Sequence, residues 1–269
     1  MILPLEDLFN DVISKAQRGL GLSTNALADT AGVNASAVEA VKNGATDTAT
    51  LLKLAPVLSL HGPALAAMAD HAWAPQPVSL EGLAQFNTTW HDMTVNAYLV
   101  WDPATREAAA FDTGATADAM LDSLSELGLT LRHLFLTHTH ADHVADIPTL
   151  AAPAVWVSEN EAFTGAQLFV PGTTWQLGGL TIQARSTWGH SKGGTTYVVR
   201  GLAKPVAVVG DALFASSMGG GQVSYADALA TNRKEIFTLP DDTIIAPGHG
   251  PLTTVGEEKA HNPFYPEFK

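Results

Sequence analysis

Four side chains of metal-binding types lie within six positions of the segment LRHLFLTHTHADHV: His138, His140, Asp142 and His143. Side chains at positions i and i+2 of an extended chain point the same way, so His138 and His140 can bind one ion together. Asp142 and His143 follow where the strand is expected to turn into a helix, and we predict that they face a second ion. The chain has no cysteine, so His and carboxylate groups must hold any metal, as they do for zinc and similar ions.

Three further candidate ligands each follow an apolar run. His190 ends LTIQARSTWGH, Asp211 ends PVAVVGD, and His249 lies in DTIIAPGHG. Loops that leave one edge of a packed sheet converge, and folds commonly build active sites from such loops. Glycines beside these positions let the backbone turn sharply and approach an ion. We therefore expect a two-metal site made by His138, His140, Asp142, His143, His190, Asp211 and His249.

The segments that must position these ligands change character near residue 72. Before it, apolar residues recur at helical spacing, and Ser23 and Gly32 are expected to begin and end one of five short helices. After it, short strand-like runs dominate and helices are fewer. The sequence thus predicts an α+β protein with a small all-α domain over residues 1–72 and a catalytic domain over residues 76–269.

The composition and net charge of the chain limit the kinds of molecule that it can bind. Hydrophobic residues make up 46% of the 269 residues, which is enough to bury a core, and the net charge of −13 makes nucleic acid a poor partner. No apolar run reaches the roughly 18 residues that a membrane-spanning helix needs. The N-terminus lacks the basic segment that precedes the apolar run of a signal peptide. We expect a cytoplasmic protein that acts on a small molecule.

The motifs THTHADH, WGHS, GDALF and PGHGP together resemble the metallo-β-lactamase superfamily, in its glyoxalase II-like branch, over about residues 78–269. The resemblance implies a four-layer αββα sandwich with metal ions at one edge of its two sheets. It also implies that His138, His140 and His190 hold one ion, that Asp142, His143 and His249 hold the other, and that Asp211 bridges them. The ions would be zinc, with iron or manganese as alternatives.

The resemblance implies a hydrolase of a small thioester or ester. Two divalent ions about 3.5–4 Å apart would share a hydroxide that attacks a carbonyl carbon, and Asp142 would be the catalytic residue that orients it. The stretch SSMGGGQV after Asp211 lacks the Arg that many thiol-substrate relatives carry, which makes glutathione thioesters less favoured. A persulfide dioxygenase with one iron, a lactonase and a β-lactamase are the alternative activities.

Four aromatic or apolar side chains are candidate substrate contacts. Trp90, His91 and Met93 lie in TTWHDM, between two strands expected to form a hairpin near the metals. Trp188 directly precedes the Gly-His pair of WGHS.

The stretch LSTNALADTAGVNASAVEAVKNG resembles the helix-turn-helix of Cro/C1-type repressors, which suggests a DNA-binding regulator with a metal-site domain as a further alternative. Residues 1–72 carry four basic residues against seven acidic ones, however, and phosphate neutralisation drives most DNA affinity. We therefore expect no nucleic-acid binding. A packing role is favoured, including a possible homodimer contact.

Overall fold

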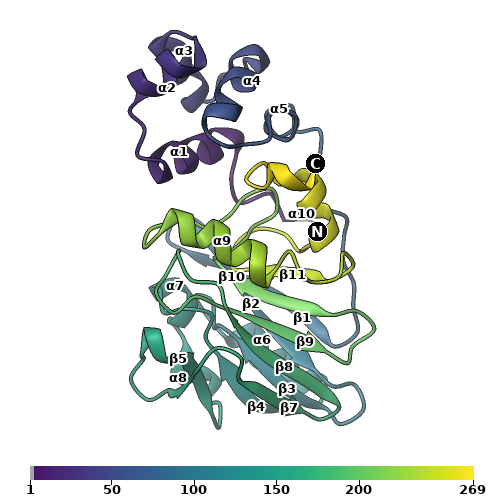
Figure 1. Ribbon diagram of the computed structural model, residues 1–269. Helices are drawn as coiled ribbons and strands as arrows, with labels where there is room; N and C mark the ends of the chain where they lie inside the picture. Colours follow the sequence, from purple (N-terminus) through teal and green to yellow (C-terminus); the bar gives the residue numbers. More distant parts are fainter. Residues whose placement is uncertain (1–2) are drawn as a thin grey trace.

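Two six-stranded sheets face one another in the computed structural model, which describes residues 3–269 (Figure 1). The first sheet has the order β1-β2-β3-β4-β5-β6. Its first three strands are antiparallel and the remainder are parallel. The strands are β1 (Leu83–Trp90), β2 (Met93–Trp101), β3 (Glu107–Phe111), β4 (Thr130–Phe135), β5 (Val155–Ser158) and β6 (Gln167–Phe169).

The second sheet has the order β12-β11-β10-β9-β8-β7, with one parallel pair between β10 and β11. The strands are β7 (Thr174–Leu177), β8 (Leu180–Ser186), β9 (Thr195–Arg200), β10 (Val206–Gly210), β11 (Ile244–Pro247) and β12 (Thr253–Thr254).

Strand β2 shows why the sheets are buried on both faces. Alternate residues of a strand point to opposite faces. Tyr98 and Val100 accordingly pack into the cluster between the two sheets, whereas Leu99 and Trp101 join the cluster on the outer face. A strand covered on both faces must be apolar at nearly every position, which is why NAYLVW carries so few polar residues.

Helices cover both outer faces. On the first sheet, Met120 and Leu124 of α6 pack with Leu136. On the second sheet, Ile236 and Val255 occupy the corresponding cluster. The helices are α6 (Asp118–Glu126), α7 (Ala141–Val144), α8 (Ile147–Leu150), α9 (Tyr225–Glu235) and α10 (Val255–His261), with short 3-10 turns η1 (Glu159–Glu161) and η2 (Pro266–Phe268). The predicted four-layer αββα sandwich is confirmed.

Five short helices precede the sheets, as expected: α1 (Phe9–Gly19), α2 (Thr24–Ala31), α3 (Ala35–Lys42), α4 (Thr48–Val57) and α5 (Gly62–Ala69). The Ser23 hydroxyl accepts the Ala26 N–H at 3.1 Å, and Gly32 ends α2 with a φ of 64°. Helix α1 starts at Phe9, later than the apolar periodicity from Leu5 suggests. The Asp11 carboxylate accepts the Leu8 N–H and so sets the N-terminus of α1 there.

The N-terminal helices pack on the outer helical layer of the second sheet (Figure 1). Ile13, Leu51 and Leu65 share one buried cluster with Leu213 and Phe237. Helices α2 and α3 lie on the side away from the sheets (Figure 1). Within residues 3–269, none of the helices has the length and apolar character needed to cross a membrane.

Candidate metal centre

The seven predicted ligands lie together at one edge of the two sheets. His138 follows β4 of the first sheet, whereas His190, Asp211 and His249 follow β8, β10 and β11 of the second. Their side-chain donor atoms form two groups, each within 4.8 Å. The first is His138, His140, His190 and Asp211, and the second is Asp142, His143 and His249.

Three imidazole nitrogens converge in the first group. His140 Nδ1 lies 3.0 Å from His138 Nε2 and 3.0 Å from His190 Nε2. His138 and His190 are buried. Burial holds the pKa of His138 well below its usual range, so the ring is neutral and its nitrogen lone pair is free to bind a cation. Three imidazole nitrogens directed at one point are typical of a metal site.

The second group combines a carboxylate with two imidazoles. Asp142 Oδ2 lies 3.5 Å from His143 Nε2 and 3.5 Å from His249 Nε2. His143 is fully buried, and Asp142 keeps 13% of its side chain exposed. Asp142 is therefore the most solvent-exposed member of this group.

Asp211 joins the two groups. Its Oδ2 lies 3.4 Å from His190 Nε2 and 3.4 Å from His249 Nε2, and its Oδ1 lies 3.3 Å from His143 Nε2. Within residues 3–269, Asp211 Oδ1 and His143 Nε2 are buried atoms that make no hydrogen bond. Buried polar atoms are rarely left unpaired, and a divalent ion beside each would satisfy both. The residues present therefore fit two ions with a shared carboxylate.

The charges of the site attract cations. Burial works to raise the pKa of Asp211, but His249 and His143 outweigh it and hold that pKa well below its usual range. Burial works to lower the pKa of His249, but the Asp211 carboxylate outweighs it and raises that pKa to about 9. Without metal, the site would take up protons, and divalent ions would replace them.

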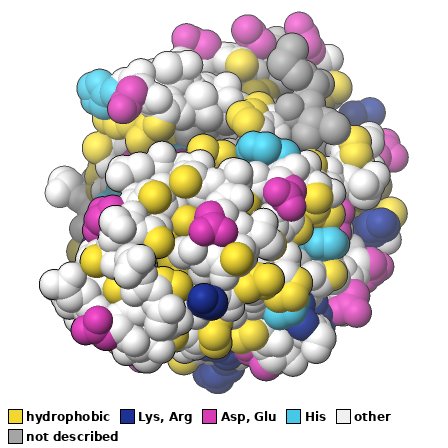
Figure 2. All heavy atoms as spheres, turned by 90° about the horizontal axis from the view of Figure 1, so that it is seen from above, with side chains coloured by type: hydrophobic (Ala, Val, Ile, Leu, Met, Phe, Trp, Pro, Cys, Tyr) yellow, Lys and Arg dark blue, Asp and Glu magenta, His cyan; other side chains and the backbone are white. Residues whose placement is uncertain are grey.

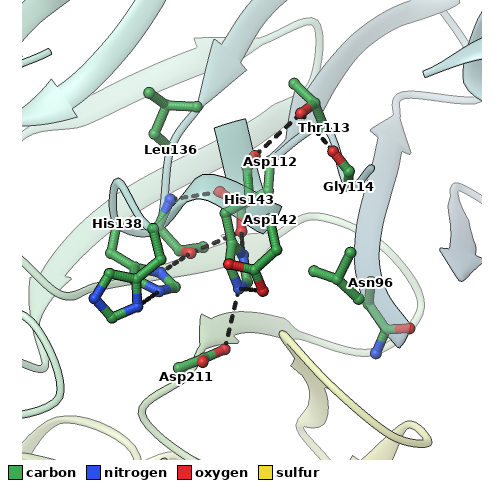
Figure 3. Close-up of polar contacts among 12 residues, drawn as sticks. Asn96, Asp112, Thr113, Gly114, Leu136, His138, Asp142, His143 and Asp211 are labelled. Atoms are coloured by element: carbon green, nitrogen blue, oxygen red, sulfur yellow. Dashed lines mark hydrogen bonds and ion pairs between the residues drawn. The ribbon is translucent and has the colours of Figure 1, made fainter. Parts of the chain in front are cut away.

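Outer hydrogen bonds fix how the histidine rings are turned. His143 Nδ1 donates to Asp112 Oδ2 at 2.8 Å (Figure 3). His249 Nδ1 donates to the Thr94 carbonyl at 2.6 Å, and His190 Nδ1 to the Gly220 carbonyl at 3.0 Å. Each ring thus keeps a proton on the outer nitrogen, so Nε2 is the nitrogen that faces the cluster and would bind an ion once it is deprotonated.

Sequence reasoning missed Asp112. Its carboxylate is buried and also accepts the N–H and hydroxyl of Thr137, each at 2.7 Å. In Figure 3, His143 lies between Asp112 and Asp211. The available signal was the segment EAAAFDTG, in which an acid follows a buried strand, as in the segment that ends at Asp211.

Glu161 was also missed. Its Oε1 accepts the backbone N–H and the hydroxyl of Thr139, both at 3.0 Å, and its Oε2 accepts the Gly193 N–H at 2.7 Å. It therefore ties the loop that carries His138 and His140 to the loop that follows His190. No local pattern marks this residue, because its partners are far from it in the sequence.

Gly248 illustrates the predicted role of glycine at the site. A Cβ atom there would lie 2.1 Å from Asp211 Oδ1 and 2.7 Å from His143 Cε1, so only glycine fits. The buried Asn96 side chain holds the same loop by donating to the carbonyls of Pro247 and Gly250 at 2.9 and 2.8 Å.

An open cavity of about 240 Å³ borders the first group, lined in part by His140, His190, Lys192, Gln222 and Val223. The predicted substrate contacts are not among its described lining residues. Trp90 and Trp188 are half-buried, His91 is exposed at the β1–β2 turn, and Met93 is 37% exposed. The turn lies beside the site, because Thr94, next to Met93, accepts the hydrogen bond from His249.

Comparison with known proteins agrees with this arrangement. The metallo-beta-lactamase superfamily model matches residues 92–166. The chain is 31% identical to the hydroxyacylglutathione hydrolase GloC of Haemophilus influenzae, over 63% of this chain and 92% of the relative. It is 31% identical to the mitochondrial persulfide dioxygenase of Homo sapiens, over 62% of this chain and 69% of that relative. The crystal structure of ETHE1 from Myxococcus xanthus superposes with a TM-score of 0.60 at 30% identity, covering 68% of this chain and 85% of that one.

Proposed function

This chain belongs to the metallo-β-lactamase superfamily, with hydrolases among its relatives, and we propose that it hydrolyses a thioester or another small ester at two divalent ions. One observation carries the proposal: two complete donor groups share the buried carboxylate of Asp211. A shared carboxylate sets the separation of two ions, which a site for a single ion does not require.

The chain's own residues have distinct tasks in this proposal. His138, His140 and His190 would hold the first ion, Asp142, His143 and His249 the second, and Asp211 both. Bound divalent ions would supply a water nucleophile at neutral pH and polarise the substrate carbonyl. Zinc suits these donors, as do iron and manganese. Asp142 is the more exposed of the two carboxylates, so it accepts a hydrogen bond from the attacking water and orients it.

The β1–β2 turn is proposed to contact substrate through Trp90, His91 and Met93. The hydrogen bond from His249 to Thr94 keeps this turn at the site. Partly exposed apolar side chains there would shield the reacting carbonyl from bulk water. Trp188 would contact substrate from the loop that carries His190.

A persulfide dioxygenase is the second candidate, because the chain is also similar to the human enzyme of that name. Such an activity would need one iron held by two histidines and one aspartate. Two observations favour hydrolysis instead. The second donor group is complete and largely buried, and no Arg follows Asp211 within the next twenty residues.

Metal analysis and a substrate panel test the proposal. The purified protein should contain up to two zinc, iron or manganese ions per chain by mass spectrometry, and His140→Ala should lose metal and activity together. A panel of thioesters, esters, lactones and β-lactams is assayed without oxygen, and oxygen uptake is measured with glutathione persulfide. Oxygen uptake without hydrolysis of any ester would assign the dioxygenase, and full activity in a metal-free Asp211→Ala variant would refute the two-ion site.

We propose a packing role, without nucleic-acid binding, for the N-terminal helices. Lys42 of α3, the helix that would enter a DNA groove, pairs with Glu39 at 3.5 Å, and Glu39 also accepts the Thr24 hydroxyl at 2.7 Å. On the face shown in Figure 2, the described Lys and Arg side chains are scattered among acidic ones. A DNA-binding helix-turn-helix needs Lys and Arg side chains directed at phosphates, and on this surface those side chains do not form a cluster.

A further inference from the structure

A second cavity lies between the N-terminal helices and the loop before α9. It has a volume of about 550 Å³, and its lining includes Lys15 and Arg18 of α1, and Gly220, Gln222 and Tyr225 across from them. Gln222 and Val223 also line the cavity at the metal centre. The two cavities therefore share one wall.

That wall is attached directly to the metal centre. The Gly220 carbonyl accepts the hydrogen bond from His190 Nδ1 at 3.0 Å. The N–H groups of Val223 and Ser224 both donate to the Gly189 carbonyl at 2.9 Å. A molecule that reaches from one cavity into the other would thus pass along this loop, which is hydrogen-bonded to the predicted metal ligand His190.

The two cavities each present an exposed cation. Arg18 lines the cavity beside α1 and Lys192 lines the cavity at the metal centre. Both are exposed, and neither forms an ion pair within residues 3–269. Lys15 differs, because it pairs with Asp7 and donates to the Met218 carbonyl at 2.8 Å, which holds α1 against the loop.

These cations stand out against the charge of the chain. Acidic residues outnumber basic ones 27 to 14, so the net charge of the chain repels anions. Two unpaired cations along adjoining cavities create a local region that attracts them. Arg presents several N–H donors in a plane that matches a carboxylate or a phosphate.

We propose that the two cavities form one substrate groove, in which Arg18 binds an oxyanion at the end of the substrate remote from the scissile bond and Lys192 assists near the metal centre. The oxyanion is a carboxylate or a phosphate, so the substrate class is an acidic thioester or ester. The inference rests on the proposed hydrolase function. It also gives α1 a role in specificity, because one side of the groove comes from the N-terminal helices.

Three matched thioesters test this, identical except for a terminal carboxylate, phosphate or neutral amide. In Arg18→Ala, KM for the anionic substrates should rise about tenfold, as expected for the loss of one charge-assisted contact. KM for the amide and kcat for all three should not change. Arg18→Lys should restore part of the loss, and Lys192→Ala should give a smaller rise. Lys53→Ala, which removes an exposed cation of α4 away from both cavities, is the control and should match wild type.

Direct binding separates this inference from the proposed chemistry. Non-hydrolysable thioether analogues with the same three termini are titrated by calorimetry into wild type and Arg18→Ala, each with its metals bound. Tighter binding of an anionic analogue than of the amide, lost in Arg18→Ala, supports the groove even if no ester in the panel is hydrolysed, and the preferred anion identifies carboxylate or phosphate. Equal affinities in both proteins, or no binding of any analogue to wild type, would overturn it.

Discussion

Replacing Asp112 with Asn should cost the protein one of the two proposed metal ions. Asp112 accepts three hydrogen bonds, from His143 Nδ1 and from the N–H and hydroxyl of Thr137. An amide can accept at its oxygen but not at its nitrogen. With the amide nitrogen toward His143, the ring must move its proton to Nε2, the atom that faces the metal centre. With the amide in the opposite orientation, its nitrogen faces the Thr137 N–H. Both groups are donors, so no hydrogen bond forms between them.

The structure sets the size of this effect. Removing the outer hydrogen-bond partner of a ligating histidine typically weakens metal binding 10–100-fold, which is about 1.4–2.7 kcal/mol. The alternative amide orientation leaves a buried donor unpaired at a cost of about 1–3 kcal/mol. Asn is chosen over Ala because Asp112 has a φ of 56°, a backbone conformation that Asn and Asp occupy more readily than other residues.

The assay is metal content by mass spectrometry after dialysis against a graded series of chelator concentrations. Asp112→Asn should retain about one ion where wild type retains two, and the missing ion should be the one bound by Asp142, His143 and His249. Two ions held at unchanged affinity would refute the assigned role of Asp112.

Asp102→Asn is the matched control for this experiment. Asp102 is also a buried carboxylate that accepts three hydrogen bonds, from Ala104, Thr105 and Gly179 at 3.0, 2.9 and 2.8 Å. None of these partners belongs to the metal centre. Asp102→Asn should therefore lower the melting temperature and leave the metal content unchanged.

Four further outcomes are expected. Trp90→Ala should raise KM on the best substrate severalfold with normal metal content, and unchanged kcat and KM would remove the β1–β2 turn from the substrate site. Glu161→Gln should lower kcat/KM about tenfold, because an amide cannot accept from both loops that Glu161 joins; wild-type kinetics would contradict that role. Burial raises the pKa of Glu258 to about 7 from 4.5, so the folded state binds a proton there more tightly than the unfolded state does. The resulting stabilisation, at most about 3 kcal/mol, is complete below about pH 4.5 and is lost as pH rises through about 7. In denaturant unfolding between about pH 5 and pH 8, Glu258→Gln should therefore show a flatter loss of stability than wild type, and equal slopes would exclude Glu258 as the source. Mixed-sequence duplex DNA should not bind at micromolar concentration and physiological salt, whereas micromolar binding that weakens steeply with salt would revive the regulator hypothesis.

The strands that carry the site were predictable because their signal is local. β4, β10 and β11 are covered on both faces at their carboxyl ends and so are continuous apolar runs ending at the candidate ligands. The short strands β6, β7 and β12 were missed. Their residues are partly exposed and carry no clear pattern, and they are strands because a neighbour supplies their hydrogen bonds.

The sequence by itself determined the type of the candidate ligands and their grouping at strand ends, because ligand chemistry is a property of single side chains and THTHADH places four of them on one short segment. The tertiary structure decided which side chains support those ligands. Asp112 reaches His143 across two parallel strands, and Glu161 joins loops from both sheets. It also decided that α1 lines the cavity of the proposed groove: Lys15 donates to the Met218 carbonyl, 203 residues away in the sequence. Such contacts depend on the order of the strands in each sheet and on how one layer packs against another. The periodicity of a helix or strand shows only which of its faces is buried, not which element covers that face.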